Sequence, residues 1–278
     1  MPLSSPRPRH LVRRHPLWVR LTHWVNVLCL VILLFSGLQI FNAHPALYWG
    51  NASDFSRPFV SMTATRGEPQ RGVTQIAGRT FDTTGVLGLS KDRDGELAER
   101  GFPHWLTLPS TQSLAMGRRW HFFFAWLFVI NGLIYLVYSL ISRRLRRDLA
   151  PTRKDLRTIG HSIVEHAKLR FPKGDEARRY NVLQKLAYLA VIFGLLPLVV
   201  LTGLTMSPGM DAALPLVQLF GGRQSARTLH FLAASGLILF TLVHVAMVIL
   251  SGPWNNLRSM ITGRYDIGSQ PAEARHAS

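Results

Sequence analysis

Four long apolar runs constrain the fold of this chain more than any other feature. Each contains about twenty residues and no Asp or Glu, and they occupy residues 17–41, 121–141, 183–206 and 229–250. About 20 apolar residues in a helix cross the roughly 30 Å of hydrocarbon in a bilayer. The sequence therefore predicts an all-α integral membrane protein, built as a bundle of four transmembrane helices.

Positive charge is unevenly divided among the segments that flank these runs. The first 22 residues contain five Lys or Arg and no acid, and residues 142–182 contain twelve against five acids. Residues 43–120 contain nine basic and seven acidic residues, and residues 207–228 contain two and one. Because short basic loops remain in the cytoplasm, we expect both termini there and residues 43–120 in the periplasm. The net charge of +17 thus reflects membrane topology and does not indicate nucleic-acid binding.

The runs divide the chain into a cytoplasmic N-terminus, a membrane domain and a tail that we expect to be disordered: residues 1–16, 17–265 and 266–278. The first run is longer than the apolar core of a signal peptide and lacks a clean cleavage site, so we expect an uncleaved span. Cys29, the only cysteine, lies within it and is expected to be a small packing residue.

The long segment 43–120 is rich in aromatic residues, which indicates a folded cap or docking surface rather than a linker. Its stretch Gln75–Leu89 predicts a short hairpin around Asp82–Gly85. On the opposite side, residues Lys154–Leu169 predict an amphipathic helix near the lipid headgroups.

Four histidines lie within the apolar runs, and their spacing predicts two pairs. His230 and His244 are fourteen residues apart, so at about 100° and 1.5 Å per residue they share a helix face roughly 21 Å apart. The topology places His121 near the outer surface with His230, and His23 near the cytoplasm with His244. Two such pairs predict two haems b with bis-histidine ligation, which leaves no open iron position and favours electron transfer.

Histidines inside a membrane also form hydrogen bonds between helices or belong to proton paths, so a haem-free transporter is an alternative. Two glycines favour haem. Gly37 follows His23 by fourteen residues and Gly132 follows His121 by eleven, on the same helix faces. A glycine there allows a flat macrocycle to approach the helix, although close packing of two helices at GxxxG-like positions explains an isolated glycine equally well.

Polar residues beside these histidines suggest further contacts. Arginine binds carboxylates such as haem propionates in a bidentate manner, and Arg20, Arg119 and Arg227 precede three of the four histidines. Ordinary extension of arginine to the membrane interface would also place them there. At the start of the third run, Asn181 and Gln184 share a helix face, where an amide can bind a quinone carbonyl. A polar first helical turn is the alternative.

At these residues the chain resembles the di-haem cytochrome b subunits of formate dehydrogenases, Ni/Fe hydrogenases and thiosulfate reductases. The matching motifs are Arg20…His23-Trp24, Arg118-Arg119-Trp120-His121, Tyr180-Asn181…Gln184-Lys185, Leu201-Thr202-Gly203 and Arg227…His230…His244. The resemblance covers all four runs and implies a quinone site near Asn181 and His244, with Tyr180 as a further candidate. It also implies electron exchange with a periplasmic metalloenzyme. The long 43–120 segment is most similar to the thiosulfate-reductase-type branch, which includes partners of periplasmic molybdopterin oxidoreductases.

We therefore expect an electron-transfer subunit rather than a stand-alone enzyme. It would lie in the lipid of the bacterial inner membrane and carry electrons between the quinone pool and a periplasmic oxidoreductase of the molybdopterin type. An oligomer is compatible with this expectation. The main alternative is a self-contained quinone-linked oxidoreductase, such as a superoxide or ferric reductase acting at the outer haem.

Overall fold

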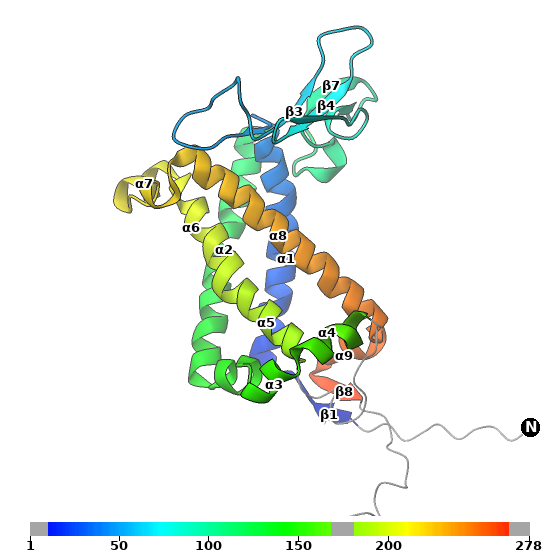
Figure 1. The fold of residues 1–278 in the computed structure, drawn as a ribbon, viewed down its shortest axis with the longest axis vertical. Coiled ribbons are helices and arrows are strands. Elements are labelled where there is room, and N and C mark those ends of the chain that lie inside the picture. The colour runs from blue at the N-terminus through cyan, green and yellow to red at the C-terminus, as the bar shows by residue number, and fades with distance from the viewer. Residues whose placement is uncertain (1–10, 168–180, 267–278) are drawn as a thin grey trace, which may run out of the picture. The chain divides into compact units, whose positions relative to one another are not determined.

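The computed structural model describes residues 11–167 and 181–266 (Figure 1). Within them, four helical segments are long and apolar enough to cross a membrane: Leu17–Phe41, Leu114–Ile141, Val182–Thr205 and Arg223–Leu250. The prediction of four spans is confirmed. The second and fourth helices begin before the corresponding apolar runs. The additional residues at their N-terminal ends include the polar Arg118, Arg119 and Arg227, which hydropathy does not assign to a span.

The spans expose most of their apolar surface. The share of buried residues in the most apolar part of each span is between 6% and 22%. In water this surface would be unfavourable, whereas in a bilayer it meets hydrocarbon. The third span consists of α5 (Val182–Ala190), a π-helical turn η4 (Val191–Leu195) and α6 (Leu196–Thr205). Pro197, the second residue of α6, lacks a backbone N–H, which accounts for the local change in hydrogen bonding.

The chain forms two compact units, which are described separately. The described residues of the first unit are 11–24, 133–167, 181–194 and 238–266, and those of the second are 25–132 and 195–237. Helices α1 (Leu17–Phe41), α2 (Leu114–Ile141) and α8 (Arg223–Leu250) each contribute residues to both units.

In the second unit, α1 and α2 pack around Cys29, Phe124 and Phe128. Cys29 is fully buried, so its expected role as a packing residue is confirmed. The Asn131 side chain donates a hydrogen bond of 2.6 Å to Asn26 Oδ1 on α1. Such a bond between spans satisfies two polar groups that hydrocarbon would leave without a partner.

The segment between α1 and α2 forms β-structure. The short strands β2 (Ala46–Leu47), β3 (Val60–Ala64), β4 (Gly72–Ile76) and β5 (Arg79–Asp82) make an antiparallel sheet in that order. β6 (Gly88–Lys91) and β7 (Leu97–Arg100) form a separate hairpin, followed by the 3₁₀ turn η1 (His104–Leu106). Figure 1 shows β3 and β4 side by side. The fold is therefore all-α in its spans, with a β-rich segment between the first two.

The predicted hairpin around Asp82–Gly85 is wrong in its turn. The hairpin joins β4 to β5 through Ala77 and Gly78, whose φ angles are 49° and 83°. Two consecutive positive φ angles suit the twist of a two-residue hairpin loop. Asp82 instead accepts hydrogen bonds from Thr84, in a turn that leads out of the sheet.

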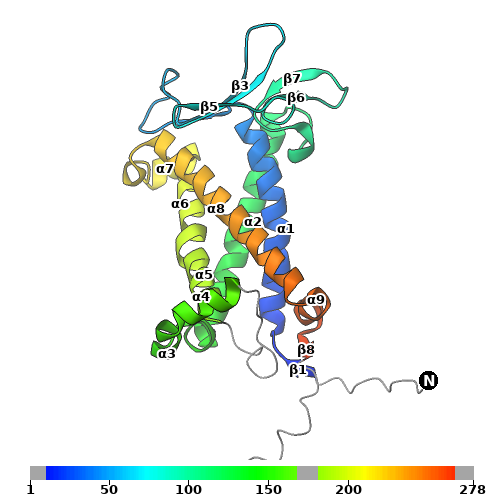
Figure 2. The same ribbon diagram turned by 45° about the vertical axis from the view of Figure 1, so that its right-hand side comes forward.

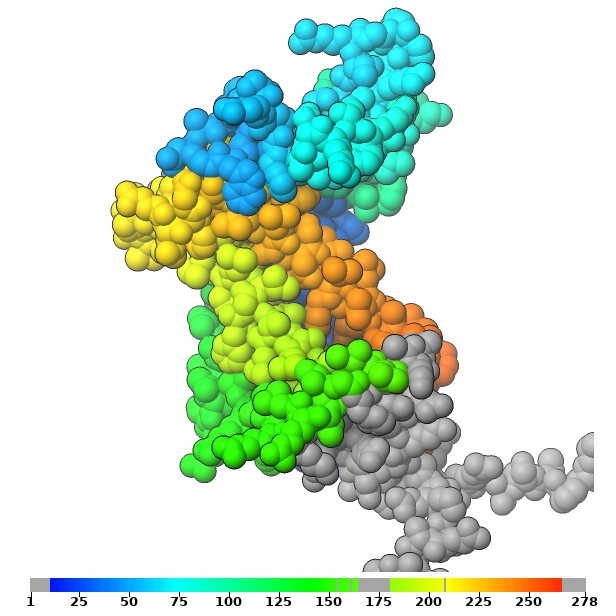
Figure 3. All heavy atoms as spheres, in the orientation of Figure 1, coloured from blue at the N-terminus to red at the C-terminus, as the bar shows by residue number. Residues whose placement is uncertain are grey.

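This outer segment, defined as residues 42–113, is held to the first turns of α8. Its Tyr48 carbonyl accepts a hydrogen bond of 2.6 Å from Thr228, and its Gly50 N–H donates to Ser225 Oγ. Figure 3 shows the blue atoms of this segment beside the yellow stretch that contains α7 (Pro208–Ala213) and η5 (Gln218–Phe220). The hydrophobic core of the segment consists of Phe41, Leu47, Val60 and Met62.

In the first unit, the predicted amphipathic helix is divided. Residues Arg153–Arg157 form α3 and Ile159–Ala167 form α4, after a π turn η2 at Leu145–Leu149. Its last two predicted residues lie outside the described part. After α8, the helix α9 (Pro253–Thr262) leads into β8 (Arg264–Asp266). β8 pairs antiparallel with β1 (Leu11–Arg13), as Figure 2 shows.

We predict that Gly88→Ala destabilises the outer segment. Gly88 has a φ of 79°, and an added Cβ would approach the Thr63 carbonyl to 2.5 Å. Gly85 has a φ of 86° but open space around it, so Gly85→Ala is the matched control. Both variants carry the cost of a left-handed alanine, about 1–3 kcal/mol. Proteolysis of the outer segment should be faster in Gly88→Ala than in Gly85→Ala, and equal rates would show that the close approach is unimportant.

Candidate functional site

His121 on α2 and His230 on α8 face each other within the second unit. Their ring centres are 6.2 Å apart, and the ring planes are inclined by 64°. These are the two histidines that the sequence assigned to the outer side of the membrane. Their side chains come from different helices, so the fold brings together residues more than a hundred positions apart.

Each of these rings contacts a buried hydroxyl on a neighbouring helix. Ser36 Oγ on α1 lies 3.1 Å from His121 Nδ1, and Thr202 Oγ1 on α6 lies 3.3 Å from His230 Nδ1. Both hydroxyls also donate to the carbonyl four residues earlier, at distances of 2.6 and 2.5 Å. A hydroxyl has one proton, so its oxygen is left to accept from the histidine.

The tautomer of each ring follows from these partners. His230 Nδ1 lies 2.9 Å from the Val199 carbonyl, which can only accept. Nδ1 therefore carries the proton, and Nε2 keeps the lone pair that binds a metal. The Ser36 contact favours the same tautomer for His121.

Glycine follows both hydroxyl residues and leaves room for the rings. A Cβ on Gly37 would lie 3.3 Å from His121 Cε1, and one on Gly203 would lie 3.3 Å from His230 Cε1. Gly37 thus accommodates the imidazole of a neighbouring helix, which differs from the expectation that it serves the His23 face. Gly132 has open space around its Cα, which agrees with the room expected there.

His23 on α1 and His244 on α8 face each other within the first unit. Their ring centres are 6.4 Å apart, with the planes inclined by 59°. Phe240 stacks on His244 at 5.9 Å, and Tyr188 on α5 contacts Phe240 edge-on at 6.1 Å. His23 Nδ1 is buried and has no hydrogen-bond partner within the described residues. The two pairs therefore differ in the contacts of Nδ1. His121 and His230 have hydrogen-bond partners at this atom, whereas His23 has none within the described residues.

The separation of the rings fits two axial ligands of one metal. A metal–imidazole nitrogen bond is about 2.0 Å, and the ring centre lies about 1.1 Å beyond the nitrogen, so two rings on opposite sides of one metal would have centres about 6.2 Å apart. Both observed separations are close to this value. No cluster of three or more His, Cys, Asp or Glu suited to a metal occurs in the described part. Pairs of histidines therefore suit a metal whose other ligands come from a macrocycle such as haem.

The three candidate propionate ligands have different surroundings. Arg20 donates to the Ile261 carbonyl in the first unit. Arg227 donates to the His44 carbonyl at 2.6 Å and lies over the Phe41 ring, so it ties α8 to the outer segment. Arg119 lies 4.0 Å from the Met116 sulfur and is exposed. Arg227 therefore has a structural partner already, whereas Arg119 is open to a further one.

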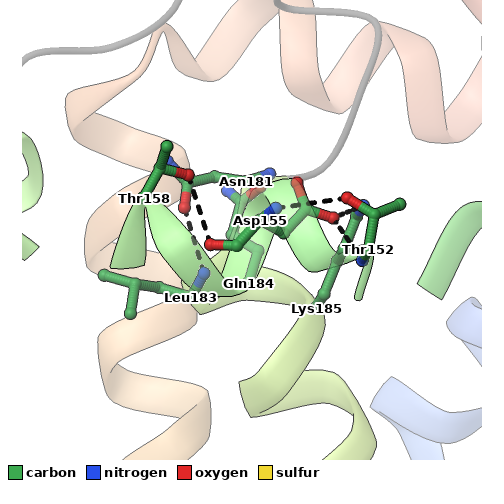
Figure 4. A network of polar contacts seen from close by, with 7 residues as sticks. All are labelled: Thr152, Asp155, Thr158, Asn181, Leu183, Gln184 and Lys185. Atoms are coloured by element: carbon green, nitrogen blue, oxygen red, sulfur yellow. Dashed lines mark hydrogen bonds and ion pairs between the residues drawn. The ribbon is translucent and has the colours of Figure 1, made fainter. Parts of the chain in front are cut away.

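Asn181 and Gln184 form the capping box that begins α5 (Figure 4). Asn181 Oδ1 accepts from the Leu183 N–H at 3.0 Å, and Gln184 Oε1 accepts from the Asn181 N–H at 3.2 Å. Lys185 forms an ion pair of 2.8 Å with Asp155, and this hydrogen bond is the main cause that lowers the pKa of Asp155 to about 2. The capping bonds use the amide oxygens, so the amide NH₂ groups are not part of the box. Tyr180 lies outside the described residues.

Sequence reasoning did not identify Ser36 or Tyr188 as site residues. The signal for Ser36 was present, because Ser36-Gly37 on α1 repeats the pattern of Thr202-Gly203 on α6. Tyr188 follows Gln184 by four residues, which places the two on one face of α5.

Comparison with known proteins agrees with this geometry. A family model described as prokaryotic cytochrome b561 matches residues 14–263. A relative from Azospira oryzae, described as a putative protein-methionine-sulfoxide reductase subunit YedZ1, is 32% identical over 236 residues, which cover 85% of this chain and 90% of that protein. No solved structure matches the chain. The chain therefore belongs to the prokaryotic cytochrome b561 family of multi-pass membrane proteins, which bind haem b and transfer electrons.

Proposed function

We propose that this chain is a di-haem cytochrome b that transfers electrons between quinone and a periplasmic oxidoreductase. The observation that supports it best is the presence of two histidine pairs whose ring separations, 6.4 and 6.2 Å, suit bis-histidine ligation. His23 and His244 would hold one haem b, and His121 and His230 the other. The proposed location is the bacterial inner membrane, with the N-terminus in the cytoplasm.

The protein's part in this function is to orient ligands and exclude other chemistry. When bound, haem b supplies a one-electron couple between ferric and ferrous iron. His121 and His230 present Nε2 because their Nδ1 atoms face hydrogen-bond acceptors. With both histidines of a pair bound to it, the iron would have no position left for oxygen or substrate, so electrons would pass to partners outside the pocket. This disfavours a self-contained superoxide or ferric reductase.

The proposed haem pairs can be tested by substitution. The intact chain should contain two haems per polypeptide in a pyridine haemochrome assay. His121→Ala and His230→Ala should remove the same spectral component, and His23→Ala and His244→Ala should remove the other. His104→Ala is the control, since its ring contacts only the Lys91 carbonyl in the outer segment among its described hydrogen bonds. One haem per wild-type chain, or loss of a single component from all four variants, would contradict the proposal.

The start of α5 is the proposed quinone site. Asn181 and Gln184 carry amide NH₂ donors outside their capping bonds, and Tyr188 on the same helix contacts Phe240, which stacks on His244. This series of contacts supports a quinone near the haem of the first unit. An NH₂ group would donate to a quinone carbonyl, and oxidation of the quinol would release two electrons and two protons.

We predict that Gln184→Glu separates quinone binding from helix capping. A glutamate keeps the oxygen that completes the capping box but lacks the NH₂ donor. Reduction of haem by a water-soluble quinol should slow about tenfold, the effect of one lost hydrogen bond. Haem content and thermal stability should not change, and Asn181→Asp serves as a second variant of the same design. Wild-type reduction rates in both variants would assign these residues to capping alone.

The proposed partner is a periplasmic oxidoreductase of the molybdopterin type. The relative from Azospira oryzae is described as a subunit of a protein-methionine-sulfoxide reductase, which supports methionine sulfoxide as a substrate of the partner. Phe55 is 76% exposed, and Trp49 and Trp105 are also exposed, whereas Phe59 and Phe102 pack against the core of the outer segment. Exposed aromatic side chains are typical anchors of protein interfaces.

We predict that Phe55→Ser weakens electron exchange with this partner. Phe55 lies beside His44 and Tyr48, in the part of the outer segment that is bonded to α8 close to His230. Oxidation of quinol-reduced haem by periplasmic extract and methionine sulfoxide should slow about tenfold, the loss typical of an interface anchor. Phe81→Ser, which changes an exposed aromatic residue on β5, is the control. If Phe55→Ser and Phe81→Ser behave alike, the outer segment does not bind the partner through this surface.

A further inference from the structure

A basic pocket occurs in the first unit, where β1, the start of α1, the end of α9 and β8 meet. It has a volume of about 480 Å³ and is lined by Leu11, Arg13, His15, Arg20, Thr262 and Arg264. Three of these residues are arginines, and none is acidic. Arg20 is also a candidate to bind a haem propionate, but Arg13 and Arg264 have no role in the proposed haem and quinone functions, so the pocket needs a separate explanation.

Two of the arginines are direct neighbours across the β1–β8 pair. Arg13 is the cross-strand partner of Arg264, and like charges at such positions destabilise a sheet. Three acids of the first unit pair with other residues: Asp148 with Arg144, Asp155 with Lys185 and Asp266 with Arg258. Within the described residues, no ion pair neutralises Arg13, Arg20 or Arg264. An anion between them would relieve the repulsion.

Two buried nitrogen atoms of the lining residues point to the same conclusion. His15 is 8% exposed, and its Nδ1 has no partner in the described part of the chain. Arg20 Nε is likewise buried without one there. A buried donor without a partner costs about 1–3 kcal/mol, so such atoms mark a place where a ligand can bind. Burial, together with the charge of Arg14, lowers the pKa of His15 to about 4, so the ring is neutral near pH 7 and can donate one N–H.

The pocket is next to a helix with the properties of a membrane-surface helix. α9 exposes Trp254 (82%), Leu257 and Ile261 along one face. It directly follows the fourth span and is fixed to α1 by a hydrogen bond from Trp24 Nε1 to the Met260 carbonyl. Such amphipathic helices lie at the boundary between headgroups and acyl chains. The end of α9, where Thr262 lines the pocket, is therefore expected at the depth of lipid phosphates.

We propose that this pocket binds a phosphate anion, supplied by the headgroup of an anionic phospholipid. Arginine forms bidentate hydrogen bonds to phosphate, and basic clusters beside spans attract anionic lipids. Free phosphate has the same binding chemistry, but the exposed apolar face of α9 favours the lipid, since acyl chains would cover it. This inference does not depend on the proposed quinone or partner functions.

The test uses the haem-loaded full-length chain after lipid removal in a neutral detergent. Native mass spectrometry should detect bound phosphatidylglycerol but not phosphatidylcholine at equal concentration. Arg13→Gln and Arg264→Gln should each weaken phosphatidylglycerol binding roughly fivefold. Arg153→Gln, which removes an exposed arginine outside the pocket in the same unit, should leave binding unchanged. Equal binding by all variants would overturn the proposal.

A stability measurement provides a second readout. Without lipid, Arg13→Gln should raise the unfolding temperature, because it removes a repulsive cross-strand pair. With phosphatidylglycerol present, the wild-type chain should become the more stable of the two. Displacement of the lipid by millimolar inorganic phosphate would identify free phosphate as the ligand and overturn the lipid assignment. Loss of one haem in Arg13→Gln would instead assign the pocket to haem propionates and also overturn the proposal.

Discussion

The imidazole rings of His121 and His230 are oriented by hydroxyl groups that contact Nδ1. Each hydroxyl is fixed in turn by a hydrogen bond to a carbonyl of its own helix. Ser36 and Thr202 each donate one turn back along their own helix, so their oxygens face the rings in a fixed direction. In hydrocarbon no water competes for these bonds. The rings therefore present Nε2 towards each other, and the glycines that follow Ser36 and Thr202 permit the close approach.

The same helix that carries His230 also holds the outer segment. Over its first two turns, α8 bonds to the outer segment through Ser225, Arg227 and Thr228. The surface proposed to bind a redox partner is thus connected by a few hydrogen bonds to the helix that carries a candidate haem ligand. This short connection would hold a partner docked there at a fixed distance from the proposed haem.

Much of this architecture could be predicted from hydropathy and spacing. The bounds of the first span are those of the first apolar run, because both ends of the helix coincide with a change in polarity. The second and fourth helices extend further, since hydropathy locates hydrocarbon-facing residues and not the polar turns beyond them. The fourteen-residue spacing of His230 and His244, combined with charge asymmetry, anticipated which histidines face each other.

Features that depend on long-range contacts were not predictable. The turn at Ala77 and Gly78 has two positive φ angles, which the sequence pattern did not indicate. Asp82–Gly85 contains residues typical of turns and does form one, but this turn is not the one that joins the two strands. The capping role of Asn181 and Gln184 was visible in the sequence as a polar first turn, but its geometry required the structure. The Ser36-Gly37 pair repeats Thr202-Gly203 in the sequence, but its contact with His121 required the structure.

The pairing of β1 with β8 joins the two ends of the described chain. The strand at residues 11–13 is synthesised before the four spans, whereas its partner at residues 264–266 is synthesised after all of them. Contacts between such distant positions have a high entropic cost of closure and form late in folding. The pocket that these strands help to line therefore forms only in chains whose synthesis has passed the fourth span. Loss of β8 would leave β1 without its partner, so occupancy of this pocket would report that all four spans have been made.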